Sequence, residues 1–237
     1  MLRRFSSRAA RFVRVSELEI SYSYVIYELA RRGVDDGAAR FLQAMAEDQL
    51  QPNAFAYQAV LNGYAKKMNK WQKAVQLFSE MRKSEIKPTA NSYAAVIDSC
   101  GKAGELRHAE RWFNQISKES IRPNSVCYNV LISANARQGY ADGALRWLQR
   151  MHNAMLFDIV AYNSALHSLC ESQSRPRAQE EAEALLRDLR SYKLHPTAIT
   201  LDLLEKLLGA ARRDELCHEL DVDMDRAQLI DRHHQRS

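Results

Sequence analysis

A tyrosine recurs about every 35 residues along this chain, and this period constrains the fold more than any other feature. The successive steps are 35, 36, 35 and 34 residues, between Tyr22, Tyr57, Tyr93, Tyr128 and Tyr162. A second series runs out of phase with the first, at Pro52, Pro88, Pro123 and Pro196. A period of this length indicates one supersecondary unit copied in tandem, in which each copy packs on its neighbours. We therefore expect a solenoid with a long open face, and no enclosed catalytic pocket.

Each repeat carries the apolar pattern of two amphipathic helices. When the tyrosine is taken as position 4, apolar residues follow at positions 7 and 8, as in Tyr93, Val96 and Ile97, which is the spacing of one helix face. A glycine near position 15 ends the first helix, because glycine accepts the left-handed conformation. These glycines are Gly33, Gly104 and Gly139. A second amphipathic stretch follows, and the proline stops it because proline lacks an N–H group. The sequence therefore predicts an all-α chain of helix-turn-helix repeats.

This phase divides the chain into five repeats and two terminal segments. The predicted repeats are 19–53, 54–89, 90–124, 125–158 and 159–197. The fifth repeat is longer than the others, and we assign the extra residues to a polar turn around Ser172–Arg177. Residues 198–237 are predicted to form a partial repeat with a C-terminal cap and tail.

The net charge of +5 is concentrated in the first eighteen residues. That segment holds Arg3, Arg4, Arg8, Arg11 and Arg14 against Glu17 alone, a local charge of +4, and the remaining chain carries only +1. An Arg-rich start that contains serines and no acid before Glu17 is typical of a mitochondrial transit peptide, and plastid transit peptides share several of these traits. The alternative for residues 1–18 is a basic helix that caps the first repeat. The basic pI of about 9.0 is therefore no evidence that the body of the chain binds nucleic acid.

Other classes of protein find little support in the sequence. The cysteines are far apart and form no CxxC pair, so we expect buried free thiols and neither a disulfide framework nor a zinc site. These residues are Cys100, Cys127, Cys170 and Cys217. No run of 18 apolar residues predicts a membrane span. Nothing resembles a phosphate-binding glycine loop or a nucleophile with an ordered base. We expect no enzymatic activity, no cofactor and no bound metal.

Several repeats open and close with strings that resemble pentatricopeptide repeats. Residues 124–132 read NSVCYNVLI and residues 158–166 read DIVAYNSAL, and two repeats close on Ile86-Lys87-Pro88-Thr89 and Ile121-Arg122-Pro123-Asn124. The resemblance covers residues 19–208 and is to members without a catalytic C-terminal domain. It implies a right-handed superhelical α-solenoid that binds single-stranded RNA, with one base per repeat. Side chains on successive helical repeats can read the edges of splayed bases in this way.

The resemblance also implies which residues select bases. In this family, position 5 and the last residue of a repeat together choose the base. Carried over to this chain, the pairs are Ser23 with Asn53, Gln58 with Thr89, Ala94 with Asn124, Asn129 with Asp158, and Asn163 with Thr197. The first pair resembles an adenine-selecting combination, the fourth resembles a uracil-selecting one, and the fifth suggests a pyrimidine. The second and third pairs depart from the pattern, and the alanine of the third cannot hydrogen-bond a base through its side chain.

Two further positions are implied to contact RNA. Position 2 presses an apolar side chain against the base, in Ile20, Phe55, Val126 and Val160. The third repeat has Asn91 there instead. Position 13 faces the phosphates and is basic in Arg31, Lys66, Lys102 and Arg137. Four cations about one repeat apart would follow an RNA backbone. The alternative is that these residues only cap carbonyl groups at helix C-termini.

The sequence as a whole predicts a non-enzymatic RNA-binding protein of mitochondria or, alternatively, of plastids. It would act in RNA processing, stability or translation by occupying a single-stranded segment. Two clear base-selecting pairs distinguish too few sequences to choose one transcript, so we expect loose binding or partner proteins in an organellar RNA or ribosome complex. The other hypothesis is a protein-binding scaffold, such as a structural subunit of an organellar ribosome. The nearly neutral body and the third repeat's departures favour that alternative.

Overall fold

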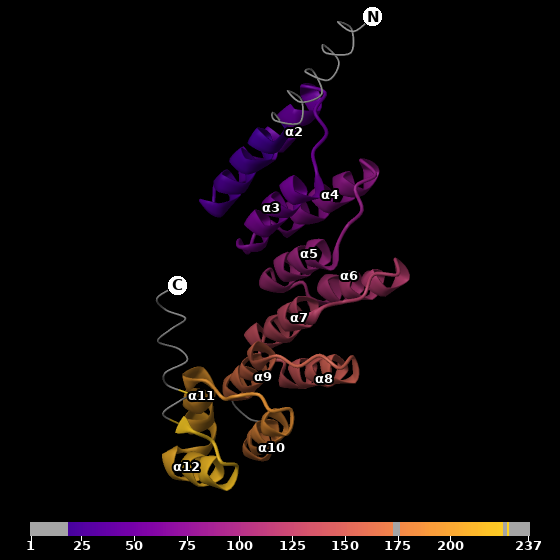
Figure 1. Cartoon of the computed structure of the whole chain (residues 1–237). Helices are drawn as coiled ribbons and strands as arrows, with labels where there is room; N and C mark the ends of the chain where they lie inside the picture. The colour runs from indigo at the N-terminus through magenta and orange to yellow at the C-terminus, as the bar shows by residue number, and fades with distance from the viewer. Residues whose placement is uncertain (1–18, 173–175, 225–226, 228–237) are drawn as a thin grey trace, which may run out of the picture. The chain divides into compact units, whose positions relative to one another are not determined.

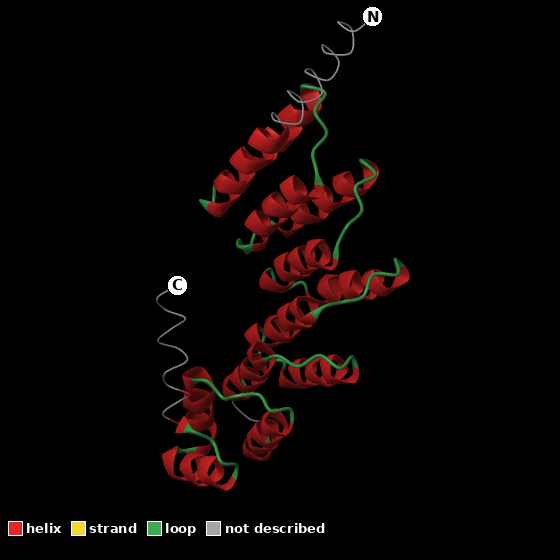
Figure 2. Ribbon diagram, in the orientation of Figure 1, coloured by secondary structure: helices red, strands yellow, loops and turns green. Residues whose placement is uncertain are grey.

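Paired helices follow one another through the residues that the structure describes, as the 35-residue period predicts (Figure 1). The computed structural model describes residues 19–172, 176–224 and 227. Within these ranges the regular secondary structure is helical and no strand occurs, and short loops join the helices (Figure 2). The chain divides into two compact halves, the N-terminal half Met1–Arg122 and the C-terminal half Pro123–Ser237.

The helices of each half alternate between first and second helices of a repeat. In the N-terminal half, a helix that includes residues 19–31 is followed by α2 (Asp35–Glu47), α3 (Ala54–Ala65), α4 (Trp71–Lys83), α5 (Ala90–Lys102) and α6 (Leu106–Lys118). The C-terminal half contains α7 (Ser125–Arg137), α8 (Ala141–Asn153), α9 (Ile159–Glu171), α10 (Ala178–Ser191), α11 (Ala198–Leu208) and α12 (Ala210–Glu219).

Within each half, the first helices of successive repeats pack against one another. In the N-terminal half α3 contacts α5, and in the C-terminal half α9 contacts both α7 and α11. The second helices α4, α8 and α10 each contact the first helix of their own repeat and that of the next. Each half therefore has a layer of first helices and a supporting layer of second helices.

The core between the two layers contains the apolar positions that the sequence pattern predicts. The small and long apolar residues of the second helices are fully buried at Ala38, Met45, Ala74, Met81, Ala109, Ile116, Ala144 and Met151. Alanine allows the paired helices to approach closely, and methionine or isoleucine fills the space between repeats. Burying these side chains from neighbouring repeats supplies the stability that no single hairpin could reach alone.

In three of the five repeats, the hydroxyl group of the recurring tyrosine contacts a side chain of its own repeat. The hydroxyl group of Tyr22 donates to Asp48 Oδ2 at 2.7 Å, and that of Tyr162 donates to Asp188 Oδ2 at 2.9 Å. In the second repeat the Tyr57 hydroxyl lies 3.3 Å from Ser84 Oγ. The ring packs in the core while the hydroxyl reaches the end of the second helix, a combination that phenylalanine cannot provide. Burial raises the pKa of the Tyr162 hydroxyl above its usual range.

The first helices α3, α5, α7, α9 and α11 begin at capping residues. In each case the side-chain oxygen of the residue before the helix accepts a hydrogen bond from a backbone N–H group of the first turn. These residues are Asn53, Thr89, Asn124, Asp158 and Thr197. Replacing such a cap with alanine typically costs about 1 kcal/mol of stability. The residues that the family resemblance assigns to base selection thus also start helices.

The predicted glycine break after the first helix is confirmed in three repeats. Gly33, Gly104 and Gly139 have φ angles of +78°, +81° and +69°. Residues with a side chain rarely adopt this left-handed region, so glycine is favoured at these turns.

The four cysteines carry free thiols, and three of them are buried as the sequence predicts. Burial raises the pKa of the Cys100 thiol to about 12, which keeps it protonated and unreactive. Within the described ranges, no helix combines the length and the hydropathy needed to cross a membrane.

Two predictions from the sequence involve segments without described coordinates. Residues 1–18, interpreted as a transit peptide or a capping helix, lie outside the described residues. The predicted polar turn in the fifth repeat separates α9 from α10, and its residues 173–175 also lie outside them. The boundaries of the five predicted repeats remain predictions.

Candidate nucleic-acid interface

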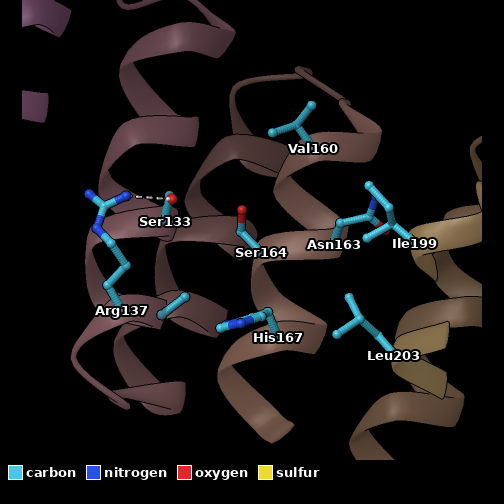
Figure 3. Close-up of a pocket in the computed structure, with 9 residues that line it drawn as sticks. Ser133, Arg137, Val160, Asn163, Ser164, His167, Ile199 and Leu203 are labelled. Carbon is cyan, nitrogen blue, oxygen red and sulfur yellow. Dashed lines mark hydrogen bonds between the residues drawn. The ribbon is translucent and has the colours of Figure 1, made fainter. Parts of the chain in front are cut away.

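A groove lies along the layer of first helices in the C-terminal half. It contains a cavity of about 410 Å³ between α7, α9 and α11 (Figure 3). The lining residues are Ser133, Ala136, Arg137, Val160, Asn163, Ser164, His167, Ile199 and Leu203. They come from three successive repeats and mix apolar, hydroxyl, amide and cationic groups, which is the composition expected for a surface that holds a polar aromatic ligand.

The lining residues occupy recurring positions of the repeat. Val160 and Ile199 stand at position 2, Asn163 at position 5, and Arg137 at position 13. The remaining polar residues are at positions 6 and 9, where Ser164 and His167 belong to one repeat. Positions spaced by three or four residues share one face of a helix, so the groove face of each first helix is defined by positions 2, 5, 6, 9 and 13.

The pair Asn129 and Asp158 is brought into direct contact. Asn129 Nδ2 donates to Asp158 Oδ2 at 2.7 Å, and Asp158 Oδ1 accepts from the backbone N–H group of Val160 at 2.9 Å. A carboxylate only accepts hydrogen bonds, so the amide nitrogen of Asn129 must face it. Asn129 Oδ1 is left buried without a hydrogen-bond partner among the described residues. An orphaned buried acceptor is costly in a folded protein.

The pair Asn163 and Thr197 is also in contact, but its hydrogen bonds are satisfied. Asn163 Nδ2 donates to Thr197 Oγ1 at 3.3 Å, and Asn163 Oδ1 accepts from the Thr200 hydroxyl at 2.7 Å. Thr197 and Thr200 form the capping box that starts α11. A ligand would have to compete with Thr200 for the amide oxygen.

In the N-terminal half, the pair Gln58 and Thr89 is joined only through Ser92. Gln58 Oε1 accepts from the Ser92 hydroxyl at 2.8 Å, and Gln58 Nε2 donates to Asn62 Oδ1 at 2.8 Å. Thr89 is engaged with Ser92 in the capping box of α5. Both ends of the Gln58 amide are therefore occupied by the protein itself.

The selecting residue of the first repeat is likewise engaged within its own helix. Ser23 is buried, and its hydroxyl donates to the Glu19 carbonyl at 2.8 Å. Asn53 accepts a hydrogen bond from the Ala56 N–H group as the cap of α3.

The members of the third pair lie in different halves of the chain. Ala94 is only 3% exposed, so its methyl group is part of the core of the N-terminal half. Asn124 caps α7 in the C-terminal half, where it accepts from the Cys127 N–H group at 3.2 Å. The alanine side chain offers no group that could hydrogen-bond an amide.

Position 2 presents an exposed apolar side chain wherever the sequence predicts one. The exposed fractions lie between 46% and 68% for Ile20, Phe55, Val126 and Val160. Sequence reasoning missed Ile199, which is 53% exposed and lines the same cavity as Val160. It could have been found from the repeat phase, because α11 begins at Ala198 and Ile199 is then position 2. Whether these residues hold a base remains a prediction.

The cations at position 13 have different surroundings. Lys102 Nζ contacts both Asp98 Oδ2 and the Ala65 carbonyl at 2.7 Å, so this lysine caps a helix end, as the alternative interpretation proposes. Arg137 lines the groove and donates to the Ser133 hydroxyl at 3.0 Å (Figure 3).

The other two cations at this position lie on the N-terminal half. Arg31 pairs with Glu28 at 2.9 Å, and this hydrogen bond lowers the pKa of the Glu28 carboxyl. Lys66 is exposed at the end of α3. The four cations are therefore not equivalent as candidates for binding phosphate.

Comparison with known protein families identifies the type of helical repeat in this chain. A model described as the PPR repeat family matches residues 52–102 and 91–137, and a second model, the PPR repeat, matches residues 126–154. Residues 52–154 of this chain thus consist of pentatricopeptide repeats. One pentatricopeptide repeat-containing protein of Arabidopsis thaliana is 32% identical over 91 residues, which are 38% of this chain and 15% of that protein. Another is 32% identical over 100 residues, which are 42% of this chain and 13% of that protein.

Solved structures of pentatricopeptide repeat proteins share the fold. PPR10 in complex with an 18-nt psaJ RNA element superposes with a TM-score of 0.63 and 22% identity, over 86% of this chain and 33% of that chain. The repeat domain of Arabidopsis thaliana protein-only RNase P 1, in complex with tRNA, gives a TM-score of 0.66 and 14% identity. That match covers 81% of this chain and 99% of the other. The all-helical solenoid fold predicted from the sequence is thereby confirmed.

Proposed function

We propose that this pentatricopeptide repeat chain binds single-stranded RNA along the outer face of its first helices. Bound there, it would act in the processing, stability or translation of an organellar transcript. The observation that carries the proposal is the cavity of the C-terminal half, where positions 2, 5 and 13 of neighbouring repeats meet. The structures of PPR10 with an RNA element and of the RNase P repeat domain with tRNA support the same ligand class.

The chemistry of the cavity fits an unpaired nucleotide. Val160 and Ile199 offer apolar surface from two successive repeats, and Asn163 extends from α9 toward Ile199 (Figure 3). Apolar side chains can contact the faces of a base while an amide hydrogen-bonds its edge. The guanidinium group of Arg137 adds a cation on the same surface, which suits a phosphodiester. We propose binding without catalysis.

The Asn129–Asp158 pair supplies the most specific part of the proposal. Asp158 fixes the orientation of the amide, and Asn129 Oδ1 would accept from a donor such as the N3–H group of uracil once the side chains that enclose it move apart. We therefore keep uracil as the base expected at this repeat.

Exchange of both residues tests this assignment. Asn129→Ala combined with Asp158→Ala is expected to weaken binding to a uridine-containing oligonucleotide by about 1–3 kcal/mol, as measured by fluorescence polarisation. Asp158→Ser is the matched control, because serine keeps the helix cap and removes the carboxylate. Circular dichroism of each variant verifies that α9 still forms. Unchanged affinity of the folded double variant would contradict the assignment of this pair.

Location in mitochondria, or alternatively in plastids, is supported by the arginine-rich composition of residues 1–18. Imaging of the fluorescently tagged full chain, with and without that segment, tests this. If the chain enters the organelle equally well without residues 1–18, the composition of this segment no longer supports an organellar location.

A protein-binding scaffold is the second candidate function. The third repeat favours it, because Ala94 is buried and Lys102 is paired with Asp98. Purification of the tagged protein after nuclease treatment separates the two candidates. A stable protein complex together with no RNA binding by the isolated chain would favour the scaffold.

A further inference from the structure

Three aromatic side chains lie exposed at the start of the N-terminal half. Tyr24 and Tyr27 on the helix that includes residues 19–31 are 63% and 39% exposed, and Phe55 at the start of α3 is 53% exposed. The rings of Tyr27 and Phe55 lie 5.6 Å apart between centroids, with an angle of 30° between their planes. Large apolar groups gathered on a surface indicate a binding site more often than scattered ones do.

The repeat phase places these rings on the groove face. Tyr24 and Tyr27 stand at positions 6 and 9 of the first repeat. In the C-terminal half the same two positions are Ser164 and His167, which line the cavity of the groove. Phe55 stands at position 2, like Val160. In the fifth repeat the counterparts of the three aromatic residues line the groove, whereas in three other hairpins the residue at position 6 is buried, as Ala59, Ala95 and Leu203.

Tyrosine at positions 6 and 9 is particular to the first repeat among the described repeats. The corresponding residues elsewhere are Ala59 and Asn62, Ala95 and Asp98, Val130 and Ser133, Ser164 and His167, and Leu203 and Lys206. The repeat fold itself thus has no need of tyrosine at these positions, since five other hairpins form without it.

A cation lies on the same helix one turn beyond Tyr27. The Arg31 guanidinium stays 58% exposed while Glu28 holds its Nη2 at 2.9 Å. The selecting residue of this repeat, Ser23, is buried and hydrogen-bonded to the Glu19 carbonyl. The first repeat therefore offers ring faces and a positive charge to a ligand, but no free hydrogen-bonding group at position 5.

We propose that Tyr24, Tyr27 and Phe55 form a stacking platform for unpaired bases of RNA, with Arg31 beside the phosphate. Aromatic rings bind any base through its π face, so this platform adds affinity without sequence preference. The proposal rests on the proposed function and refines it: the first repeat holds RNA by stacking, in place of the adenine selection implied by Ser23 and Asn53. The adjacent cation and the continuity with position 2 favour a nucleotide over an apolar protein segment.

Binding of homopolymeric A, U and C oligonucleotides to the full chain tests the platform. Tyr24→Ala combined with Tyr27→Ala is expected to reduce affinity about 5- to 150-fold, and by a similar factor for all three RNAs. Tyr24→Phe with Tyr27→Phe keeps the rings and is expected to stay within about twofold of the unchanged chain. Tyr140→Ala is the matched control, because Tyr140 is 59% exposed but lies outside the groove positions. Ultraviolet crosslinking of the unchanged chain to RNA is expected to modify Tyr24 or Tyr27.

The outcomes separate the platform from the function on which it rests. If the unchanged chain binds none of the RNAs, the proposed function fails, and the platform fails with it. If it binds RNA but the alanine variant binds equally well, or crosslinks avoid both tyrosines, only the platform is overturned. A loss confined to one base, or an equal loss in the phenylalanine variant, would show hydrogen bonding by the hydroxyl groups and also overturn stacking. A photoreactive residue at position 24 that crosslinks to residues 1–18 in saturating RNA would show that the chain's own start covers the rings.

Discussion

The two halves of this chain use the same repeat positions for different chemistry. In the C-terminal half, Asn129 contacts Asp158 and keeps one amide oxygen without a partner among the described residues, whereas the Asn163 amide is satisfied by Thr197 and Thr200. In the N-terminal half, Gln58 is occupied by neighbouring side chains and Ser23 is hydrogen-bonded to its own helix. Repeats with one backbone geometry can therefore differ in whether they offer a base an amide edge, an aromatic face, or neither.

The repeat phase alone therefore does not define a base-selecting site. The phase fixes where a side chain projects, but hydrogen bonds with neighbouring residues decide whether it is available. A Gln58 amide that already binds Asn62 and Ser92 gains little from a base, because those bonds must be broken first. We therefore expect sequence preference to come from the C-terminal half, and affinity without preference from the N-terminal half.

The largest effect, on the free energy of unfolding, is expected at two helix contacts, one in each half, where a glycine packs against a buried polar side chain. A Cβ atom on Gly143 would lie 2.0 Å from Asn135 Oδ1, whereas one on Gly63 would lie 2.7 Å from Asp35 Oδ1. Asn135 is buried and donates to the Leu131 carbonyl at 2.8 Å, so it has little freedom to move. We predict that Gly143→Ala lowers the free energy of unfolding by about 3 kcal/mol and Gly63→Ala by about 1 kcal/mol.

Urea unfolding followed by tryptophan fluorescence measures both changes, with Trp147 reporting the C-terminal half. The control is Gly143→Ala in an Asn135→Ala background, where the space is open and alanine is a better helix former than glycine. In that background Gly143→Ala is expected to be neutral or stabilising. An equal loss in both backgrounds would mean that the contact with Asn135 is not the cause.

A smaller effect, on base preference, is expected when the residues of the predicted selecting pair of the fourth repeat are introduced into the second repeat. Gln58→Asn with Thr89→Asp reproduces the Asn129–Asp158 combination in the second repeat, and aspartate preserves the cap of α5. We predict a gain of about 1 kcal/mol in preference for uridine at the corresponding nucleotide, since an aligned amide discriminates among base edges. Competition between oligonucleotides that differ at one position measures this gain.

The reciprocal exchange is the control for that experiment. Asn129→Gln with Asp158→Thr should remove a uridine preference of similar size at the nucleotide read by the fourth repeat. If neither exchange moves the preference, the two halves do not differ in the way described above.

The smallest effect concerns the cations at position 13. Removing one phosphate contact lowers the slope of log affinity against log salt by about 0.7 for a single strand. We predict this change for Arg137→Gln, because Arg137 lines the groove. A clearly smaller change is expected for Lys102→Gln, because Asp98 and the Ala65 carbonyl already hold that ammonium group. Titrations at several salt concentrations measure both slopes, and equal slopes would remove the distinction between these cations.

The fold was largely predictable because it depends on burial, and burial follows sequence period. The spacing of Tyr93, Val96 and Ile97 defines a buried helix face without any knowledge of the neighbours. The left-handed turns at Gly104 and Gly139 follow from the conformational range of glycine alone.

The candidate site was less predictable, because it depends on which hydrogen bonds are made. No sequence pattern shows that Lys102 turns to the Ala65 carbonyl, since this contact joins residues 37 positions apart. The same holds for the bond between Ser92 and Gln58, which spans 34 positions. Tyr24 and Tyr27 were not singled out because the family resemblance directs attention to positions 2, 5 and 13 and the last residue. Their exposure, seen in the structure, is what marks them.

The last residue of each repeat starts a helix and is also the predicted base-selecting residue, and this double role would limit how target preference can evolve. Asn53, Thr89, Asn124, Asp158 and Thr197 each start a helix with a side-chain oxygen. Mutations among asparagine, aspartate, serine and threonine preserve that oxygen, so a lineage can drift through them with little loss of stability. Mutations to other residues remove the helix cap and lower the stability of the fold before any new base preference can be selected. The fold can therefore be kept while the bound RNA sequence changes, as long as the last residue of the repeat is one of these four amino acids.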